Sequence, residues 1–342
     1  MKKIIFRVDA GSKVGFGHLN RCLILAEEFN KKKYKIIFLL SKSSKPFIKK
    51  IKLLKFKFYF LDLTLRKKKI YNQIEDSRLS IKKLIKLKEV EYIFVDNYLL
   101  DYQWEKEISP YTKKIFVIDD FENRKHFCDF YLNSNFLLKK NRIKKNLLKP
   151  NTKILTEKKY FLINKIYRNI KTYKKRNFPL NFFVFFGMED SKNYSFRTLK
   201  WISNKKLPGN YLFILNTSLK ESLKKNKKFY SNRNFKFYKI QKNLYKILKK
   251  VDAMIGSGGS INLERILLKL PGIIFKVSDN QKTNCEIIKK FQLGYYKGTF
   301  ENINQKKFYN IYNNFSKNFN KYKNFHNFRI DANGAKRVVS LL

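Results

Sequence analysis

Ten short apolar runs limit what this chain can fold into. They lie at residues 4–8, 34–40, 56–61, 92–96 and 115–119, and then at residues 181–186, 211–215, 235–240, 253–255 and 273–275. Amphipathic stretches separate most of these runs, and such alternation predicts βα units that build a parallel sheet. The predicted fold class is therefore α/β, with two Rossmann-like domains.

A basic, irregular stretch divides the two sets of runs. We predict an N-terminal domain over residues 1–155, a basic linker over 156–178, and a C-terminal domain with a terminal helix over 179–342. A chain of 342 residues is longer than one core usually holds, which agrees with two domains. Ligands of open α/β folds bind at the carboxyl ends of the strands, so we expect the site in a cleft between facing domains.

The net charge is strongly positive, because 77 Lys and Arg stand against 26 Asp and Glu to give +51. Such a charge would usually suggest nucleic acid. The lysines, however, are spread along the chain and accompany abundant Phe, Tyr, Ile and Asn with only 12 Gly and 6 Pro, which is the pattern of an AT-rich genome. We therefore expect no specific nucleic-acid partner. A non-enzymatic polyanion-binding protein is the alternative from another class.

Several other classes of protein are excluded. An apolar content of 44% is too high for a disordered chain. No run of about 18 uncharged apolar residues occurs, so no integral membrane segment is expected. Arg7 and Asp9 interrupt the first apolar stretch too early for a signal peptide, so we expect a cytoplasmic protein. Cys22, Cys128 and Cys285 form no C-x-x-C pair, which excludes a disulfide framework and a zinc knuckle.

Half of the scarce glycines lie in two loops that follow predicted strands and open helices. Of 12 glycines, three stand at Gly11, Gly15 and Gly17, and three at Gly256, Gly258 and Gly259. Glycine permits positive φ and a close approach of the backbone to a ligand. A helix N-terminus offers free N–H groups to an anion. The two loops are therefore the predicted ligand-binding segments.

The first loop ends at His18, the first polar side chain of a predicted helix whose apolar stripe includes Cys22. The positive end of a helix favours the neutral imidazole, which can act as a base. The glycine spacing differs from the G-x-G-x-x-G fingerprint, so NAD is a poor fit. Arg7 and Asp9 share one strand face, where they either brace the loop as an ion pair or contact substrate.

The second loop is suited to a diphosphate. Gly258, Gly259 and Ser260 can supply backbone and hydroxyl donors at a helix N-terminus, whereas the Lys-Ser/Thr ending of a P-loop is missing. Glu264, one turn into the helix, either accepts the two hydroxyls of a ribose or is a solvated helix carboxylate. Gly187 ends the first strand of the second domain at the same edge.

These motifs resemble those of the UDP-2,4-diacetamido-2,4,6-trideoxy-β-L-altropyranose hydrolases of pseudaminic acid biosynthesis, which have the two-domain fold of the glycosyltransferase-B type. The N-terminal signature is matched by Arg7, Asp9, Gly15, Gly17, His18, Arg21, Cys22, Leu23 and Ala26. Further matching blocks lie at residues 95–98, 118–133, 256–281 and 331–338.

The resemblance implies a hydrolase of a UDP-linked diacetamido sugar that needs neither a cofactor nor a metal. His18 would activate a water that attacks the anomeric carbon with inversion and releases UDP. The other implied residues are catalytic Tyr98 and Asn280, substrate-binding Arg7, Asp9, Gly15, Gly17, Arg21 and Gly187, and UDP-binding Gly258, Gly259, Ser260 and Glu264. His126 is expected to be structural, and a monomer is expected.

The chain departs from the family pattern at two places. Met188 and Glu189 replace a Gly-Ser pair that usually follows Gly187, which removes a glycine and adds a negative charge near the expected diphosphate. The usual glycine before the linker tyrosine is missing from residues 156–160. The nearest alternative function is a nucleotide-sugar glycosyltransferase of the same fold, which differs only in whether water or an acceptor hydroxyl receives the sugar.

Overall fold

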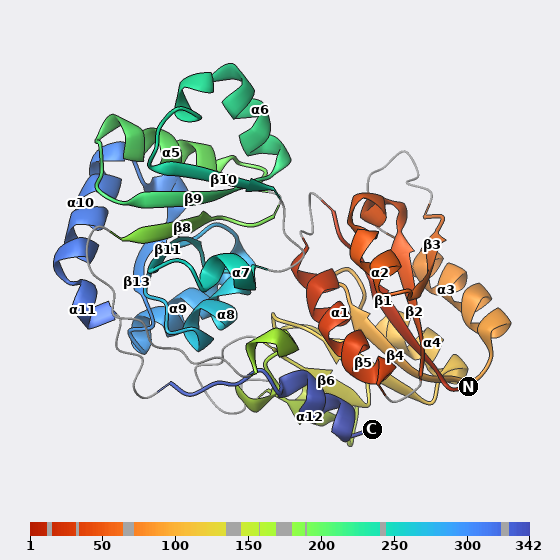
Figure 1. The fold of residues 1–342 in the computed structure, drawn as a ribbon. Coiled ribbons are helices and arrows are strands. Elements are labelled where there is room, and N and C mark those ends of the chain that lie inside the picture. The colour runs from red at the N-terminus through yellow and green to blue at the C-terminus, as the bar shows by residue number, and fades with distance from the viewer. Residues whose placement is uncertain are drawn as a thin grey trace. The chain divides into compact units, whose positions relative to one another are not determined.

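The computed structural model describes residues 1–11, 16–31, 34–63, 72–134, 145–156, 158–168, 180–188, 190–239, 244–322 and 328–342. These residues form two compact units. The first unit comprises Met1–Lys165 together with Ala332–Leu342, and the second comprises Ile166–Asp331 (Figure 1). Each unit contains one parallel β-sheet with helices packed on it, so the prediction of two parallel-sheet α/β domains is confirmed.

The sheet of the first unit has seven parallel strands in the order β3-β2-β1-β4-β5-β6-β7. The strands are β1 (Lys3–Val8), β2 (Lys35–Ser41), β3 (Lys57–Leu61), β4 (Val90–Asp96), β5 (Lys114–Ile118), β6 (Phe130–Leu132) and β7 (Lys153–Leu155). The helices are α1 (Gly17–Asn30), α2 (Lys49–Leu53), α3 (Gln73–Leu87), α4 (Tyr102–Ile108) and α12 (Gly334–Ser340). Sequence patterns missed β6 and β7, because three residues are too few to show a period.

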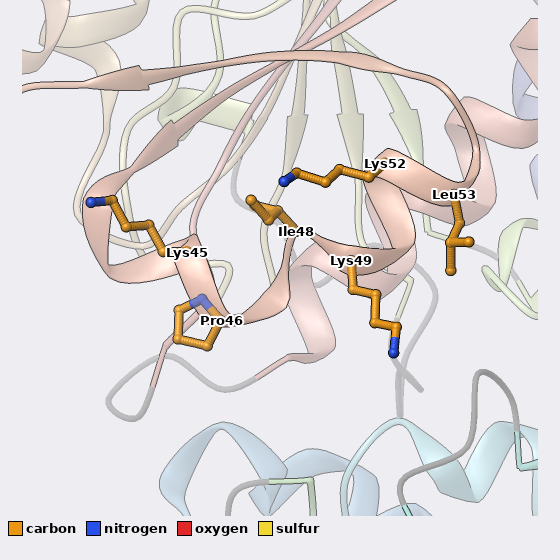
Figure 2. Close-up of a pocket in the computed structure, with 6 residues that line it drawn as sticks. All are labelled: Lys45, Pro46, Ile48, Lys49, Lys52 and Leu53. Atoms are coloured by element: carbon orange, nitrogen blue, oxygen red, sulfur yellow. The ribbon is translucent and has the colours of Figure 1, made fainter.

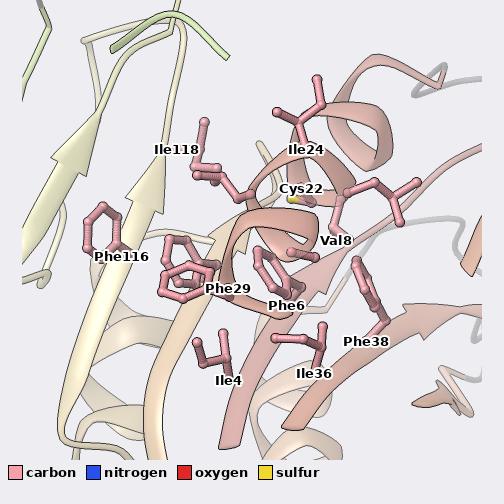
Figure 3. Packing of buried hydrophobic residues seen from close by; sticks show 14 of the residues in the cluster. Ile4, Phe6, Val8, Cys22, Ile24, Phe29, Ile36, Phe38, Phe116 and Ile118 are labelled. Atoms are coloured by element: carbon pink, nitrogen blue, oxygen red, sulfur yellow. The ribbon is translucent and has the colours of Figure 1, made fainter. Parts of the chain in front are cut away.

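Both faces of this sheet are buried, which is why its strands read as nearly continuous apolar runs. Successive side chains of a strand point to opposite faces, so Phe6 and Ile5 belong to different cores. Phe6 stacks between Phe38 and Phe94 at ring-centroid distances of 5.0 and 4.9 Å. Cys22, Ile24 and Phe29 of α1 pack on that face (Figure 3). Helices α2 and α12 contribute to the same core, while α3 and α4 cover the other face.

The last helix of the chain packs on the first unit. Residues of α12 share a core with α1, and the Tyr92 hydroxyl donates to the Leu342 carbonyl oxygen at 3.3 Å. A Cβ on Gly334 would lie 2.1 Å from the Phe161 carbonyl oxygen, so the close approach of these two segments requires glycine. The structure thus moves the terminal helix from the predicted C-terminal domain to the N-terminal one. The short helix η4 (Lys158–Tyr160), predicted as linker, also lies in the first unit.

The second unit repeats the architecture with six parallel strands in the order β10-β9-β8-β11-β12-β13. They are β8 (Asn181–Phe185), β9 (Asn210–Leu215), β10 (Phe235–Lys239), β11 (Ala253–Ser257), β12 (Gly272–Lys276) and β13 (Tyr295–Thr299). The helices are α5 (Tyr194–Asn204), α6 (Thr217–Lys225), α7 (Tyr245–Leu248), α8 (Ile261–Leu267), α9 (Lys282–Lys290), α10 (Gln305–Lys317) and α11 (Phe319–Tyr322). Sequence patterns missed β13, whose five residues are all half-buried.

Candidate active site

Each sheet reverses its strand order once, and several of the predicted site residues follow the strands at that point. In the first unit the reversal lies between β1 and β4, which lead to His18 and Tyr98. In the second unit it lies between β8 and β11, which lead to Gly187 and to the loop before α8. Ligands of open α/β sheets bind at the carboxyl ends of the strands beside such a reversal.

His18 occupies the first turn of α1, and its imidazole is held by a buried carboxylate. Its Nδ1 lies 2.5 Å from Oδ1 of Asp96, the last residue of β4, and only 5% of His18 is exposed. A carboxylate that accepts from Nδ1–H fixes the tautomer in which Nε2 carries a lone pair. The arrangement therefore prepares Nε2 to take a proton.

Arg21, one turn after His18, bridges two carboxylates. Its Nε and Nη2 donate to Asp96 at 2.5 and 2.6 Å, and its Nη1 donates to the two oxygens of Asp120 at 2.7 and 2.8 Å. Burial alone would raise the pKa of Asp96, but Arg21 and His18 hold it well below its ordinary value. The guanidinium thus faces protein carboxylates, which supports a positioning role instead of the predicted contact with substrate.

Tyr98 lies beside the imidazole. Its ring meets the His18 ring edge-on, with centroids 4.5 Å apart and planes at 82°, and its hydroxyl donates to Asp120. Burial and the Asp120 carboxylate raise the pKa of Tyr98 far above its ordinary value. Because the single hydroxyl hydrogen of Tyr98 is donated to Asp120, the Tyr98 oxygen can accept a hydrogen bond from a ligand.

The structure corrects the assignment of Arg7 as a substrate ligand. The Arg7 side chain has no exposed surface, and it donates to Asp9 at 2.8 and 2.9 Å and to Asp76 at 2.5 Å. Asp9 also accepts from the Ser41 amide and from Asn97, so the ion pair braces the ends of β1, β2 and β4. Sequence patterns missed Asp76, which lies on α3 and is brought to Arg7 only by folding.

The glycines of the first loop are only partly described. Gly17 is exposed and begins α1, whereas Gly15 lies outside the described residues. Gly11 needs no special explanation, since a Cβ there would meet Ser43 at an ordinary 3.5 Å.

In the second unit, Gly258 is a packing position. Its amide donates to the Phe275 carbonyl at 2.9 Å, and a Cβ would lie 2.2 Å from the sulfur of Cys285. The prediction that the Gly258 amide binds diphosphate is therefore wrong, because that donor is already used. Among the described residues, the amides of Gly259 and Ser260 donate to no protein acceptor, and Ser260 is exposed.

Two asparagines hold this loop in place, and sequence reasoning missed both. Asn262 donates to the carbonyl oxygens of Ser257 and Gly259 at 2.7 and 2.9 Å, and Asn284 donates to that of Gly258 at 3.3 Å. Side-chain amides that satisfy loop carbonyls fix the direction of the free N–H groups. An Asn in the first turn after a glycine loop is the sequence signal that could have identified Asn262.

Glu264 has a protein partner that the sequence did not reveal. Its Oε2 accepts from the Tyr167 hydroxyl at 3.1 Å, and the buried Tyr167 packs edge-on against Tyr245, which begins α7. Glu264 itself is half-buried in the first turn of α8. The tyrosine therefore orients a carboxylate that still reaches the surface.

Gly187 and Asn280 each follow the carboxyl end of a strand of the second sheet. Gly187 follows β8 with φ +125°, a conformation that L side chains rarely adopt. Asn280 follows β12 in the short helix η7 (Asp279–Gln281), where its Oδ1 accepts from the Ser278 hydroxyl at 2.6 Å. Met188 is half-buried, and Glu189 lies outside the described residues.

The first unit also carries a surface hollow of about 480 Å³ on η1 (Lys42–Phe47) and α2. It is lined by three lysines and three apolar residues (Figure 2), namely Lys45, Pro46, Ile48, Lys49, Lys52 and Leu53. None of the predicted site residues lines it.

The chain is similar in sequence to a sugar-nucleotide hydrolase. It is 27% identical over 274 residues to the UDP-2,4-diacetamido-2,4,6-trideoxy-β-L-altropyranose hydrolase of Campylobacter jejuni, covering 78% of this chain and 89% of the relative. This chain is a relative of that hydrolase. No family model matches the chain.

Solved structures establish the fold of this chain. MurG of Acinetobacter baumannii superposes with a TM-score of 0.65 at 13% identity, covering 99% of both chains. HepE of Anabaena, in complex with UDP and glucose, superposes with a TM-score of 0.60 at 10% identity, covering 100% of this chain and 99% of the neighbour. The fold is therefore of the glycosyltransferase-B type.

Two features are absent from the described residues. None of the helices found there has both the length and the apolar character needed to cross a bilayer. The described part of the chain also holds no group of three or more His, Cys, Asp or Glu side chains placed to bind a metal ion.

Proposed function

We propose that this protein hydrolyses a UDP-activated 2,4-diacetamido-2,4,6-trideoxy sugar to the free sugar and UDP. The observation that carries the proposal is the pairing of His18 Nδ1 with the buried Asp96 at 2.5 Å, in a chain related to such a hydrolase. An imidazole held in this way is a general base of the kind that hydrolysis requires.

In the proposed reaction, His18 Nε2 takes a proton from water as the water oxygen attacks the anomeric carbon. The bond from that carbon to the diphosphate oxygen breaks, and UDP leaves with the electron pair. Attack opposite the leaving group inverts the anomeric centre. Asp96 stabilises the imidazolium that forms, and no metal takes part.

We propose that the second unit binds the nucleotide. The Gly259 and Ser260 amides donate to the diphosphate, where negative charge grows as the bond breaks, and Glu264 accepts the ribose hydroxyls. Gly187 allows close approach to the substrate, and Asn280 and Tyr98 contact the sugar. HepE, a neighbour of the same fold, has been solved with UDP and glucose, which supports a UDP-sugar as the ligand class.

The finer parts of the proposal rest on the hydrolase relative. We propose a cytoplasmic, monomeric enzyme that supplies the free diacetamido sugar for a nonulosonic acid of the pseudaminic type. The test is to mix the purified protein with a panel of UDP- and CMP-activated diacetamido sugars and to measure nucleotide release. Saturable release of UDP from one of them supports the proposal, and release from none of them contradicts it.

A glycosyltransferase of the same fold is the second candidate, since MurG shares the whole architecture. The same assay separates the two functions when the sugar product is identified. A hydrolase incorporates oxygen from ¹⁸O-water into the free sugar at full rate without an acceptor. Turnover that appears only after an acceptor alcohol is added would favour the transferase.

A further inference from the structure

The acidic side chain Asp120 lies at the end of a chain of contacts that begins at His18. Asp96 binds His18 and Arg21, Arg21 binds Asp120 with both oxygens at 2.7 and 2.8 Å, and Asp120 accepts from the Tyr98 hydroxyl. The side chains of Asp96, Arg21 and Asp120 are 0%, 11% and 7% exposed. Water therefore screens these charges weakly.

The charges in this cluster show what Asp120, the second carboxylate, contributes. Arg21 makes two N–H···O contacts to Asp96, so on its own it would offset the negative charge that His18 faces. Asp120 supplies a second negative charge to the same guanidinium. With two carboxylates, one guanidinium and a neutral imidazole, the net charge of the cluster is −1. It becomes zero when His18 is protonated. Without Asp120 the same step would end at +1.

We propose that Asp120 is a positioning residue that offsets Arg21 and thereby lets Asp96 stabilise the protonated form of His18. The inference rests on the proposed role of His18 as general base, and it adds a residue that touches neither the water nor the sugar. The same carboxylate accepts the hydroxyl hydrogen of Tyr98, which lies beside His18. Asp120 therefore orients the Tyr98 hydroxyl and also affects the charge around His18.

Among the described residues, the titratable and charged groups around His18 are few. Arg21 and Cys22 come from α1, Asp96 from β4, Tyr98 from the segment after β4, and Asp120 from the segment after β5. Cys22 contacts Asp96 at 3.6 Å, and burial raises the pKa of its thiol well above the ordinary value. Asp120 is therefore the group whose charge can be removed without touching the imidazole.

The test is a proton NMR titration of the His18 ring in the free protein, with the signal assigned by its loss in His18→Asn. In Asp120→Asn we expect the midpoint to move to lower pH by about 0.5–1 unit, because a negative charge has been removed. We also expect kcat to fall about 10–100-fold and the acidic limb of the pH–rate profile to move in the same direction. Asp120→Glu should restore the midpoint.

Asp62→Asn is the matched control, since Asp62 lies in the same unit, is 67% exposed and pairs with Lys42. It should leave both the titration and kcat unchanged. An unmoved His18 titration in folded Asp120→Asn would overturn the inference. If Asp120→Asn does not fold, Arg21→Gln is compared with the double variant Arg21→Gln/Asp120→Asn. The midpoint should rise in Arg21→Gln and return toward the wild-type value in the double variant, and equal midpoints in the two would overturn the inference. A shifted titration in a protein that releases no UDP would reject the proposed function and leave this inference standing.

Discussion

His18 is the residue on which the proposed chemistry depends most. General-base assistance contributes typically 10²–10⁴-fold, so His18→Asn should lower kcat by about that factor. UDP affinity should stay the same, because the nucleotide is proposed to bind the second unit. Rate and affinity are measured on one preparation whose folding is checked by circular dichroism, and wild-type turnover by the folded variant would end the assignment.

Glu264 offers a second test at the residue scale. Glu264→Ala should weaken UDP binding by about 1–3 kcal/mol if a charged hydrogen bond to ribose is lost. Tyr167→Phe removes the hydroxyl that holds Glu264 at 3.1 Å and should cause a smaller loss. The exposed Glu221 on α6 gives the control Glu221→Gln, which should have no effect. Calorimetry with UDP measures all three, and unchanged affinity in Glu264→Ala would remove this carboxylate from the site.

At the scale of elements, the docking of α12 on the first unit depends on Gly334. A Cβ there would lie 2.1 Å from the Phe161 carbonyl oxygen, a backbone atom that cannot move aside cheaply. Gly334→Ala should therefore destabilise the protein by about 1–3 kcal/mol, the typical cost of overpacking. Gly11→Ala is the control, since its Cβ meets Ser43 at 3.5 Å and should cost little. Equal thermal stability of the two variants would contradict the tight α12 contact.

The buried cluster between α4 and β5 predicts how stability changes with pH. His126 Nδ1 lies 2.7 Å from Glu105, and Nε2 lies 3.9 Å from Asp119. Burial alone would lower the pKa of His126, but the two carboxylates raise it from 6.5 to about 9. Protonated His126 thus stabilises the folded state fully below about pH 6.5, and this contribution disappears as the pH rises to about 9.

We expect the free energy of unfolding to fall over that interval by roughly 2–3 kcal/mol, at about 1.4 kcal/mol per unit of pKa difference. Urea unfolding at a series of pH values measures the slope, with His18→Asn as the background that removes the other described histidine. In that background His126→Gln should abolish most of the slope. A slope that persists in the double variant would show that His126 is not its source.

At the scale of the whole molecule, the charge of +51 is expected to reflect composition. DNA should bind without sequence preference at low salt. The affinity should fall steeply as the salt concentration rises, because the release of counterions from DNA then favours binding less. Fluorescence anisotropy with two unrelated duplexes, at low and at physiological salt, measures this. Sub-micromolar, sequence-selective binding at physiological salt would instead support a nucleic-acid function.

The α/β class, the strands other than β6, β7 and β13, and the loops that precede His18 and Glu264 could be predicted from the sequence. Each of these depends on local features: period, turn residues, or a glycine loop before a helix. The contacts that these residues make become visible only once the chain is folded. The tertiary structure placed Asp76 against Arg7, Asp120 against Arg21 and Tyr167 against Glu264, and it moved α12 to the first unit. The residues of these three pairs lie 69, 99 and 97 positions apart in the sequence. Local sequence patterns cannot predict such pairs, because they form only when whole helices and strands pack together.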